Sequence, residues 1–187
     1  MSLSLAKSEI LAAMLLLDKP ERAIQIAKEA GKAFPSVMMH VIGLTRMGYT
    51  VSPEKGFYTL TEKGKEALGI PEINSEKAKT ILADMPQDKT FHFYAGLGKP
   101  LGLQACSLQD FYDKVLEIKL DSISFHTSRG DFESWFGAIG DVELAKKIAL
   151  LKEKKMGGEE LRSRLAEIVK NRCIELSKAA GHAVFPD

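Results

Sequence analysis

The stretch VMMHVIGLTRMGYTVSPEKGFYTLTEKGKEAL, residues 37–68, places a helical pattern directly before a strand-turn-strand pattern. The apolar residues of its first part recur at the spacing of one helix face; they are Val37, Val41 and Leu44. Gly48 is suited to end that helix. Segments 49–51 and 57–60 are rich in β-forming residues, and Ser-Pro-Glu-Lys-Gly between them predicts a tight turn. We therefore predict a helix, a β-hairpin and a further short helix that begins at Thr-Glu-Lys-Gly.

Two more helices are predicted before this stretch. The first starts at about Ser4 and carries an apolar stripe, which consists of Ile10, Leu11, Met14, Leu15 and Leu17. The second starts at Pro20, since a first helical position tolerates the missing N–H, and ends at Gly31 with Ile24 and Ala27 facing inward. The third opens at Pro35 or Ser36. Three helices followed by a hairpin predict a winged helix-turn-helix.

These segments resemble the winged-helix transcription regulators of the MarR and PadR type. The resemblance rests on Gly48-Tyr49-Thr50-Val51 and on Tyr58-Thr59-Leu60-Thr61-Glu62-Lys63-Gly64. It implies a DNA-binding domain over residues 1–70, with the third helix in the major groove and the hairpin on the adjacent backbone. It also implies a homodimer, because such regulators read two half-sites with two copies of the helix.

The side chains left for DNA lie on the helix face opposite the core and on the hairpin. The candidates are Ser36, Met39, His40, Arg46, Lys55 and Lys63. Much of that helix face is apolar, whereas base edges are usually read by Arg, Lys, Asn or Gln. Residues 1–70 contain nine Lys or Arg and seven Asp or Glu, so phosphate contacts depend on a local patch. The alternative is a protein-interaction module that presents Met38, Met39 and Ile42 to a partner.

A break in the pattern separates two predicted domains. Residues 69–75 contain a proline and a helix cap at Asn74 or Ser75, and a short helix follows as a connector or dimerisation arm within a linker over residues 71–89. For residues 90–187 we predict a mainly helical domain, with a strand-like segment over 91–94 and a loop over 96–102.

The second domain resembles a small, mainly archaeal domain family of uncharacterised function. The segments that carry the resemblance are 107–111, 122–126, 129–135, 140–141, 144–145 and 158–162. The resemblance covers most of residues 90–176, and it implies neither a ligand nor a reaction.

The densest polar cluster of the second domain is a candidate ligand site. It consists of His126, Arg129, Asp131 and Glu133. On a helical turn His126 and Arg129 can face a common anion. The alternative is that Asp131 caps the next helix while the other two satisfy buried contacts. The glycine-rich segment 96–99 resembles a phosphate-binding loop, but Pro100 removes an N–H and favours a flexible loop.

Composition limits the remaining classes of function. The net charge of +1 shows no global positive field, and Cys106 and Cys173 lack metal-ligand spacing, as do the histidines. We expect no metal, no cofactor and no catalytic residue. The apolar run 11–17 is too short to span a membrane and is no signal peptide, so we expect a cytoplasmic protein.

The combined prediction is a DNA-binding transcription regulator whose C-terminal domain dimerises, senses a small ligand or contacts a protein partner. The alternatives are the protein-interaction module and an enzyme or enzyme subunit with a site at His126–Glu133.

Overall fold

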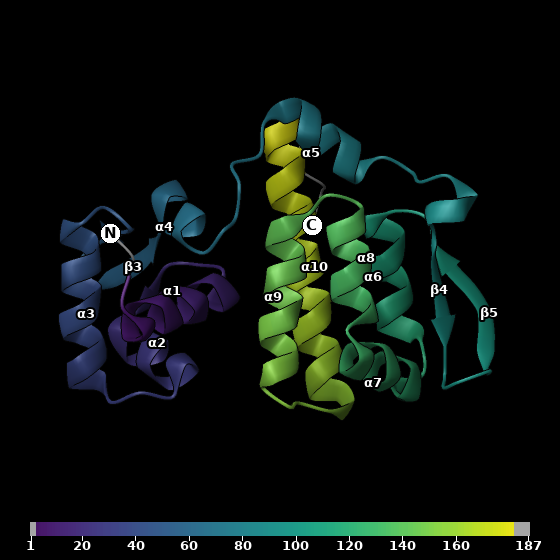
Figure 1. Cartoon of the computed structure of the whole chain (residues 1–187), viewed down its shortest axis with the longest axis horizontal. Coiled ribbons are helices and arrows are strands. Elements are labelled where there is room, and N and C mark those ends of the chain that lie inside the picture. The colour runs from purple at the N-terminus through teal and green to yellow at the C-terminus, as the bar shows by residue number, and fades with distance from the viewer. Residues whose placement is uncertain (1–2, 182–187) are drawn as a thin grey trace. The chain divides into compact units, whose positions relative to one another are not determined.

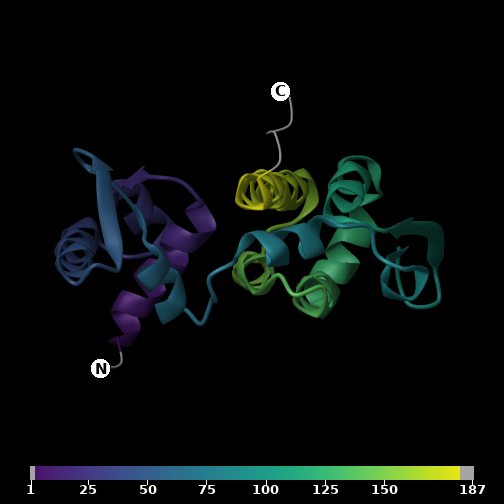
Figure 2. The same cartoon turned by 90° about the horizontal axis from the view of Figure 1, so that it is seen from above.

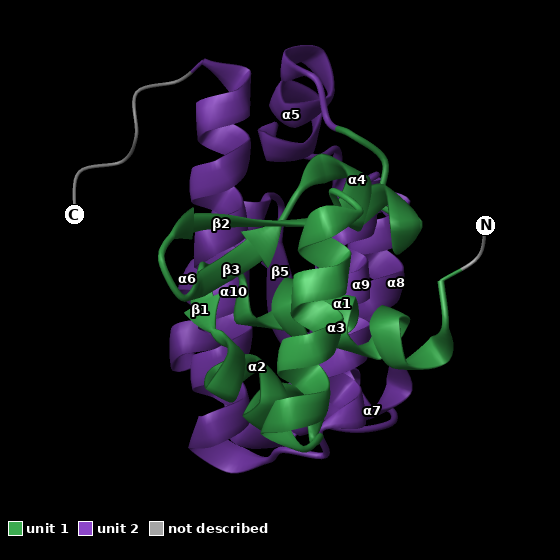
Figure 3. Cartoon of the chain, turned by 90° about the vertical axis from the view of Figure 1, so that its left-hand side faces the viewer, with its two compact units in different colours: residues 1–72 green, residues 73–187 purple. Residues whose placement is uncertain are grey.

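The computed structural model describes residues 3–181, and the chain divides into two compact units, residues 1–72 and 73–187 (Figures 1 and 3). Within the described residues the chain forms ten α-helices, one 3-10 turn and five strands. The strands form two small antiparallel sheets. The prediction of a mainly helical protein is confirmed. The ends of the predicted domains, residues 1–2 and 182–187, lie outside the described residues.

The first unit combines four helices with a three-stranded sheet. Its elements are α1 (Leu5–Leu17), β1 (Glu21–Arg22), α2 (Ala23–Ala30), α3 (Phe34–Arg46), β2 (Thr50–Glu54), β3 (Phe57–Leu60) and α4 (Glu62–Ala67). The sheet has the order β1-β3-β2, and both pairings are antiparallel. α1 and α2 pack against α3, whose buried face is the one that the spacing predicts and consists of Val37, Val41 and Leu44.

The second helix differs from the prediction at its start. Glu21 and Arg22 are extended and pair with β3, so α2 begins at Ala23 rather than at Pro20. Ile24 is 53% exposed, and Ile26 takes the core position instead. A two-residue strand has no periodicity of its own, and its pairing with a strand more than 30 positions away overrides the local helical pattern.

The second unit is a helical bundle with a β-hairpin. Its elements are α5 (Ser75–Leu82), the 3-10 turn (Gln87–Lys89), β4 (Phe91–Tyr94), β5 (Pro100–Ala105), α6 (Leu108–Glu117), α7 (Leu120–Arg129), α8 (Asp131–Ala138), α9 (Val142–Glu153) and α10 (Gly158–Ala180). α9 and α10 run side by side (Figure 1), and both are seen nearly end-on from above (Figure 2). α5, the predicted connector helix, packs against α10 and buries Ala78 and Ile81.

The loop predicted over residues 96–102 is shorter in the structure. Its second part begins β5, which pairs with β4 so that Phe91 lies opposite Ala105 and His92 opposite Gln104. Glycine and proline are unfavourable in strands, so the local sequence of this segment does not predict β5. The strand forms because its backbone pairs with the unpaired N–H and C=O groups of β4. The second unit is therefore not purely helical.

Aromatic side chains fix β4 against the helices of the second unit. Phe91 and Phe93 point into the bundle, and the Phe91 ring lies 5.9 Å from the Phe111 ring of α6 and 5.2 Å from the Phe132 ring of α8. The indole N–H of Trp135 donates to the carbonyl of Lys89 at 2.8 Å, just before the strand. Offset and edge-to-face aromatic pairs of this kind stabilise a unique arrangement. They place the end of β4 beside α7 and the start of α8.

None of the helices within residues 3–181 combines the length and the apolar character that a membrane crossing requires.

Candidate functional site

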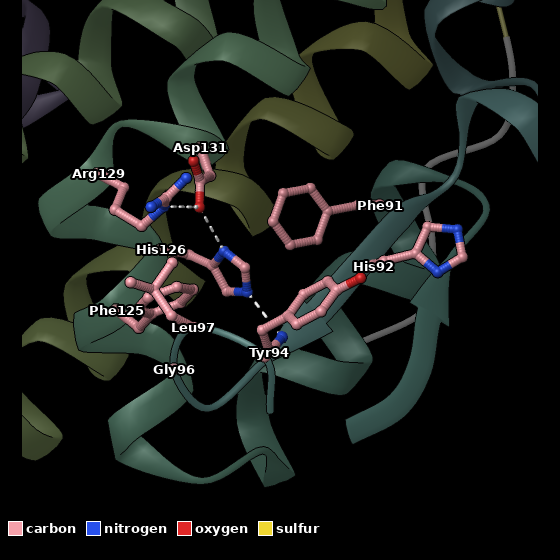
Figure 4. A pocket seen from close by; sticks show the side chains of 10 residues that line it. Phe91, His92, Tyr94, Gly96, Leu97, Phe125, His126, Arg129 and Asp131 are labelled. Carbon is pink, nitrogen blue, oxygen red and sulfur yellow. Dashed lines mark hydrogen bonds and ion pairs between the residues drawn. The ribbon is translucent and has the colours of Figure 1, made fainter. Parts of the chain in front are cut away.

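A pocket of about 270 Å³ lies between the β4–β5 hairpin, α7 and the start of α8 (Figure 4). Its lining comes from three separate segments: Phe91, His92, Tyr94, Gly96, Leu97 and Gly98 of the hairpin, Phe125, His126 and Arg129 of α7, and Asp131 of α8. Three of the four residues of the predicted polar cluster therefore meet in one cavity. The β4–β5 hairpin forms the rest of the cavity wall, and the polar cluster alone does not predict its contribution.

His126 connects all three segments of the pocket. Its Nε2 accepts the backbone N–H of Tyr94 at 2.8 Å, so the ring proton resides on Nδ1, which donates to Oδ2 of Asp131 at 2.8 Å (Figure 4). The side chain is only 3% exposed. Burial lowers the pKa of His126 below its ordinary value, although the Asp131 carboxylate opposes the shift. The folded protein thus holds a neutral imidazole with both nitrogens hydrogen-bonded. His126 therefore positions Asp131 relative to β4.

Asp131 also fixes the guanidinium of Arg129. The Nε of Arg129 donates to Oδ2 at 3.1 Å, and the guanidinium lies 5.1 Å from the centre of the Phe125 ring. The predicted capping role for Asp131 is wrong, because the N-cap of α8 is Gly130 and no side chain caps this helix. Asp131 instead occupies the first turn of α8, where the helix dipole stabilises its negative charge.

The loop between β4 and β5 forms one wall of the pocket. It is closed by two hydrogen bonds, from the Ala95 N–H to the Lys99 carbonyl at 2.9 Å and from the Lys99 N–H to the Gly96 carbonyl at 3.1 Å. Gly98 takes a φ of +69°, a conformation that glycine adopts without strain. Leu97 is 79% exposed at the tip of this loop. An apolar side chain thus stands at the mouth of the cavity.

Comparison with protein families gives a match over residues 58–170 to DUF5752, a family of unknown function. The chain belongs to this family. The matched range runs from β3 into α10 and includes every residue that lines the pocket. No curated protein and no solved structure matches the chain.

Glu133, the fourth residue of the predicted cluster, is not part of the pocket of this DUF5752 member. Its carboxylate pairs with Nζ of Lys152 on α9 at 2.7 Å. Residues 131 and 133 lie two positions apart on α8, so they point to different sides of the helix. Of the four predicted ligand residues, Glu133 is therefore the one that does not line this pocket.

The predicted DNA-contact residues occupy the first unit of the DUF5752 chain. Ser36 and His40 are half-buried on α3, Met39 is 64% exposed, and Arg46 lies exposed in the last turn of the helix. Lys55 is exposed in the hairpin turn between β2 and β3. Within residues 3–181 the side chains of Arg46 and Lys55 form no ion pair or hydrogen bond, so both cations face solvent.

Lys63 has a structural contact in addition to its charge. Its Nζ donates to the carbonyl of Met47 at 2.8 Å and lies 4.6 Å from the centre of the Tyr49 ring. A lysine that satisfies the last carbonyls of a helix also interacts favourably with the helix dipole. Lys63 thus connects α4 to the end of α3.

Proposed function

We propose that this DUF5752 protein is a DNA-binding transcription regulator whose first unit is a winged helix. The supporting observation is the order of elements in that unit: three helices followed by the β2–β3 hairpin, with the short strand β1 on the free edge of β3. The three helices and the hairpin are the arrangement that the resemblance to the MarR and PadR regulators implies.

In this proposal α3 enters the major groove of duplex DNA, which is wide enough for one helix. Arg46 and Lys55 contact phosphates, because both side chains are exposed and free within residues 3–181. Ser36 and His40 supply the polar groups near the bases, and Met39 offers an apolar contact of the kind that a thymine methyl accepts. Lys63 acts indirectly, by holding the end of α3.

Fluorescence anisotropy with labelled duplex DNA across a salt series tests the proposal. We expect binding that weakens as salt rises, and Arg46→Ala and Lys55→Ala each to reduce the slope of log K against log salt by about 0.9, the value for one lost phosphate contact. Lys170→Ala, which removes an exposed lysine from α10, is the charge-matched control and should leave the slope unchanged. Absence of binding at low salt would overturn the proposal.

We assign the second unit to dimerisation, ligand sensing or partner contact. The pocket beside His126 supports the sensing role. Sedimentation velocity tests the dimer, and a chain that stays monomeric at high concentration would overturn that part. A cytoplasmic location belongs to the same proposal and is supported by the two free thiols of Cys106 and Cys173, which suit a reducing compartment.

A second candidate function uses the same helix for protein contact. Its supporting observation is the apolar character of exposed α3 side chains: Met39 is 64%, Phe34 44% and Ile42 37% exposed. Apolar exposed groups of this kind often mark interaction surfaces. Met39→Lys separates the two functions, since an added cation strengthens or preserves phosphate-driven binding and disrupts an apolar interface. If Met39→Lys loses self-association or the binding of a captured protein, protein contact through α3 is favoured, whatever the result with DNA.

A further inference from the structure

The pocket of the second unit has one ionic wall. Arg129 and Asp131 form it, joined by the 3.1 Å contact between Nε and Oδ2. Within residues 3–181 the terminal guanidinium nitrogens of Arg129 and the Oδ1 of Asp131 make no hydrogen bond. The wall therefore offers a cluster of N–H donors beside an unused carboxylate oxygen. The ring of Phe125 and the Nδ1 of His126 hold this pair in position.

The other walls are apolar. In Figure 4, Phe91 and Tyr94 of β4 appear on one side of the His126 ring, and Leu97 of the hairpin loop and Phe125 of α7 appear on the other. Leu97 is 79% exposed and Tyr94 37% exposed, so both have surface that a ligand would cover. Burial of such surface is favourable in proportion to its area. A ligand for this pocket thus combines a polar head with an apolar body.

The size and the charge of the pocket restrict that head and body further. The volume of about 270 Å³ lies just below the range of about 300–1,000 Å³ that small-molecule sites occupy, which favours a compact ligand. The ionic wall is neutral overall, because Asp131 balances Arg129 and both nitrogens of His126 are engaged as in a neutral imidazole. A simple anion would be attracted by Arg129 and repelled by Asp131. A zwitterion gains from both charges.

We propose that this pocket binds a free α-amino acid with an apolar side chain. The carboxylate of the ligand accepts from the terminal nitrogens of Arg129, and its ammonium donates to Oδ1 of Asp131. Its side chain lies against Tyr94 and Leu97 of the hairpin. His126 is a positioning residue, because its two ring nitrogens are already bonded to Tyr94 and Asp131.

Isothermal titration calorimetry on the full chain tests the proposal with L-phenylalanine and L-leucine. We expect at least one of the two to bind. Phenylacetate lacks the ammonium group, phenethylamine lacks the carboxylate, and glycine lacks the apolar side chain. Each of these three should bind at least about tenfold more weakly, the change that corresponds to 1.4 kcal/mol.

Two variants locate the site, and a third serves as control. Arg129→Gln removes the charge that holds the carboxylate, and Leu97→Ser removes exposed apolar surface without disturbing the core; each should weaken binding at least about tenfold. Arg164→Gln removes a half-buried arginine of α10 that pairs with Glu167, and it should leave affinity unchanged. Far-ultraviolet circular dichroism of each variant checks that the fold is retained, and Leu97→Ser keeps the test valid if Arg129→Gln unfolds.

Three results would overturn the proposal: no heat with either amino acid, phenylacetate binding as tightly as L-phenylalanine, or full affinity in folded Leu97→Ser. The second result would reveal a plain anion site in which Asp131 takes no part. The titration contains no DNA, so its outcome is independent of the regulator proposal.

Discussion

Arg172 and Asp141 form a buried, multiply bonded ion pair inside the second unit. The Nε of Arg172 lies 3.1 and 2.9 Å from the two carboxylate oxygens, and a terminal nitrogen lies 2.9 Å from one of them. Both side chains are at most 2% exposed. Asp141 also caps α9 by accepting the Leu144 N–H at 3.1 Å. One carboxylate therefore connects the start of α9 to the middle of α10.

Asp141→Asn should lower the free energy of unfolding by about 1.5–3 kcal/mol, the range for a hydrogen bond to a charged group, because Arg172 loses one of its carboxylate partners and keeps Glu143 and Glu175. Asparagine caps helices about as well as aspartate, so the substitution isolates the loss of charge. Urea unfolding measures the change by linear extrapolation. The control is Glu167→Gln, whose exposed pair with Arg164 should contribute at most about 1 kcal/mol. Equal losses in the two variants would show that the buried charge is not decisive.

Gly64 allows α4 to approach the hairpin closely. A Cβ at this position would lie 2.2 Å from the carbonyl oxygen of Tyr49 and 3.2 Å from a methyl group of Leu60. Gly64→Ala should therefore destabilise the first unit by about 1–3 kcal/mol, the usual range for overpacking. Thermal or urea unfolding measures this change.

Gly43→Ala is the matched control for Gly64→Ala. Gly43 lies inside α3, and a Cβ there would meet no atom within 4 Å. Alanine is the better helix former, so this substitution should stabilise the protein by up to about 1 kcal/mol. A Gly64→Ala variant that is as stable as the wild type would contradict the close approach of α4 to Tyr49.

The parts of the fold that sequence predicts are those fixed by local chemistry. The side chains of Thr61 and Asn74 each accept the N–H three residues later, as the predicted starts of their helices require. β1 and β5 escape prediction because their strands are selected by pairing partners elsewhere in the chain. The periodic face of α3 is confirmed because its core spacing spans the whole helix.

The candidate site shows the same division. His126, Arg129 and Asp131 lie within six positions, so sequence alone brings them together. The hydrogen bond between His126 and Tyr94 spans 32 positions and depends on the aromatic packing of β4, which no local pattern specifies. The alternation over residues 91–94 was the available signal, since it separates inward Phe91 and Phe93 from outward His92 and Tyr94.

The two cysteines should differ in their reaction with Ellman's reagent. Cys173 is buried on α10, and burial raises the pKa of its thiol to about 12. Cys106 is half-buried, and its pKa is raised by a hydrogen bond with Asp110. The reagent must reach a thiolate. We therefore expect Cys106 of the folded protein to react slowly, with one equivalent of reagent, and Cys173 not to react. Urea should expose both, and equal labelling of the folded protein would contradict the packing of α10.

The stability of the second unit should fall in mild acid through His126. Burial lowers the pKa of this histidine in the folded state, whereas the unfolded chain has a value near 6.5. Above about pH 6.5 both states are neutral and the contribution is complete. As the pH falls toward the folded-state pKa, His126 is protonated in the unfolded chain but remains neutral in the folded protein. The free energy of unfolding therefore decreases.

The expected loss is at most about 1.4 kcal/mol per pH unit for this single proton. Urea unfolding of the wild type and of His126→Gln between pH 5 and 8 measures it by difference, which removes the titration of the carboxylates common to both. Glutamine retains an acceptor for the Tyr94 N–H, so the variant changes chiefly the titration. If His126→Gln keeps the wild-type dependence, the imidazole is not held neutral between Tyr94 and Asp131.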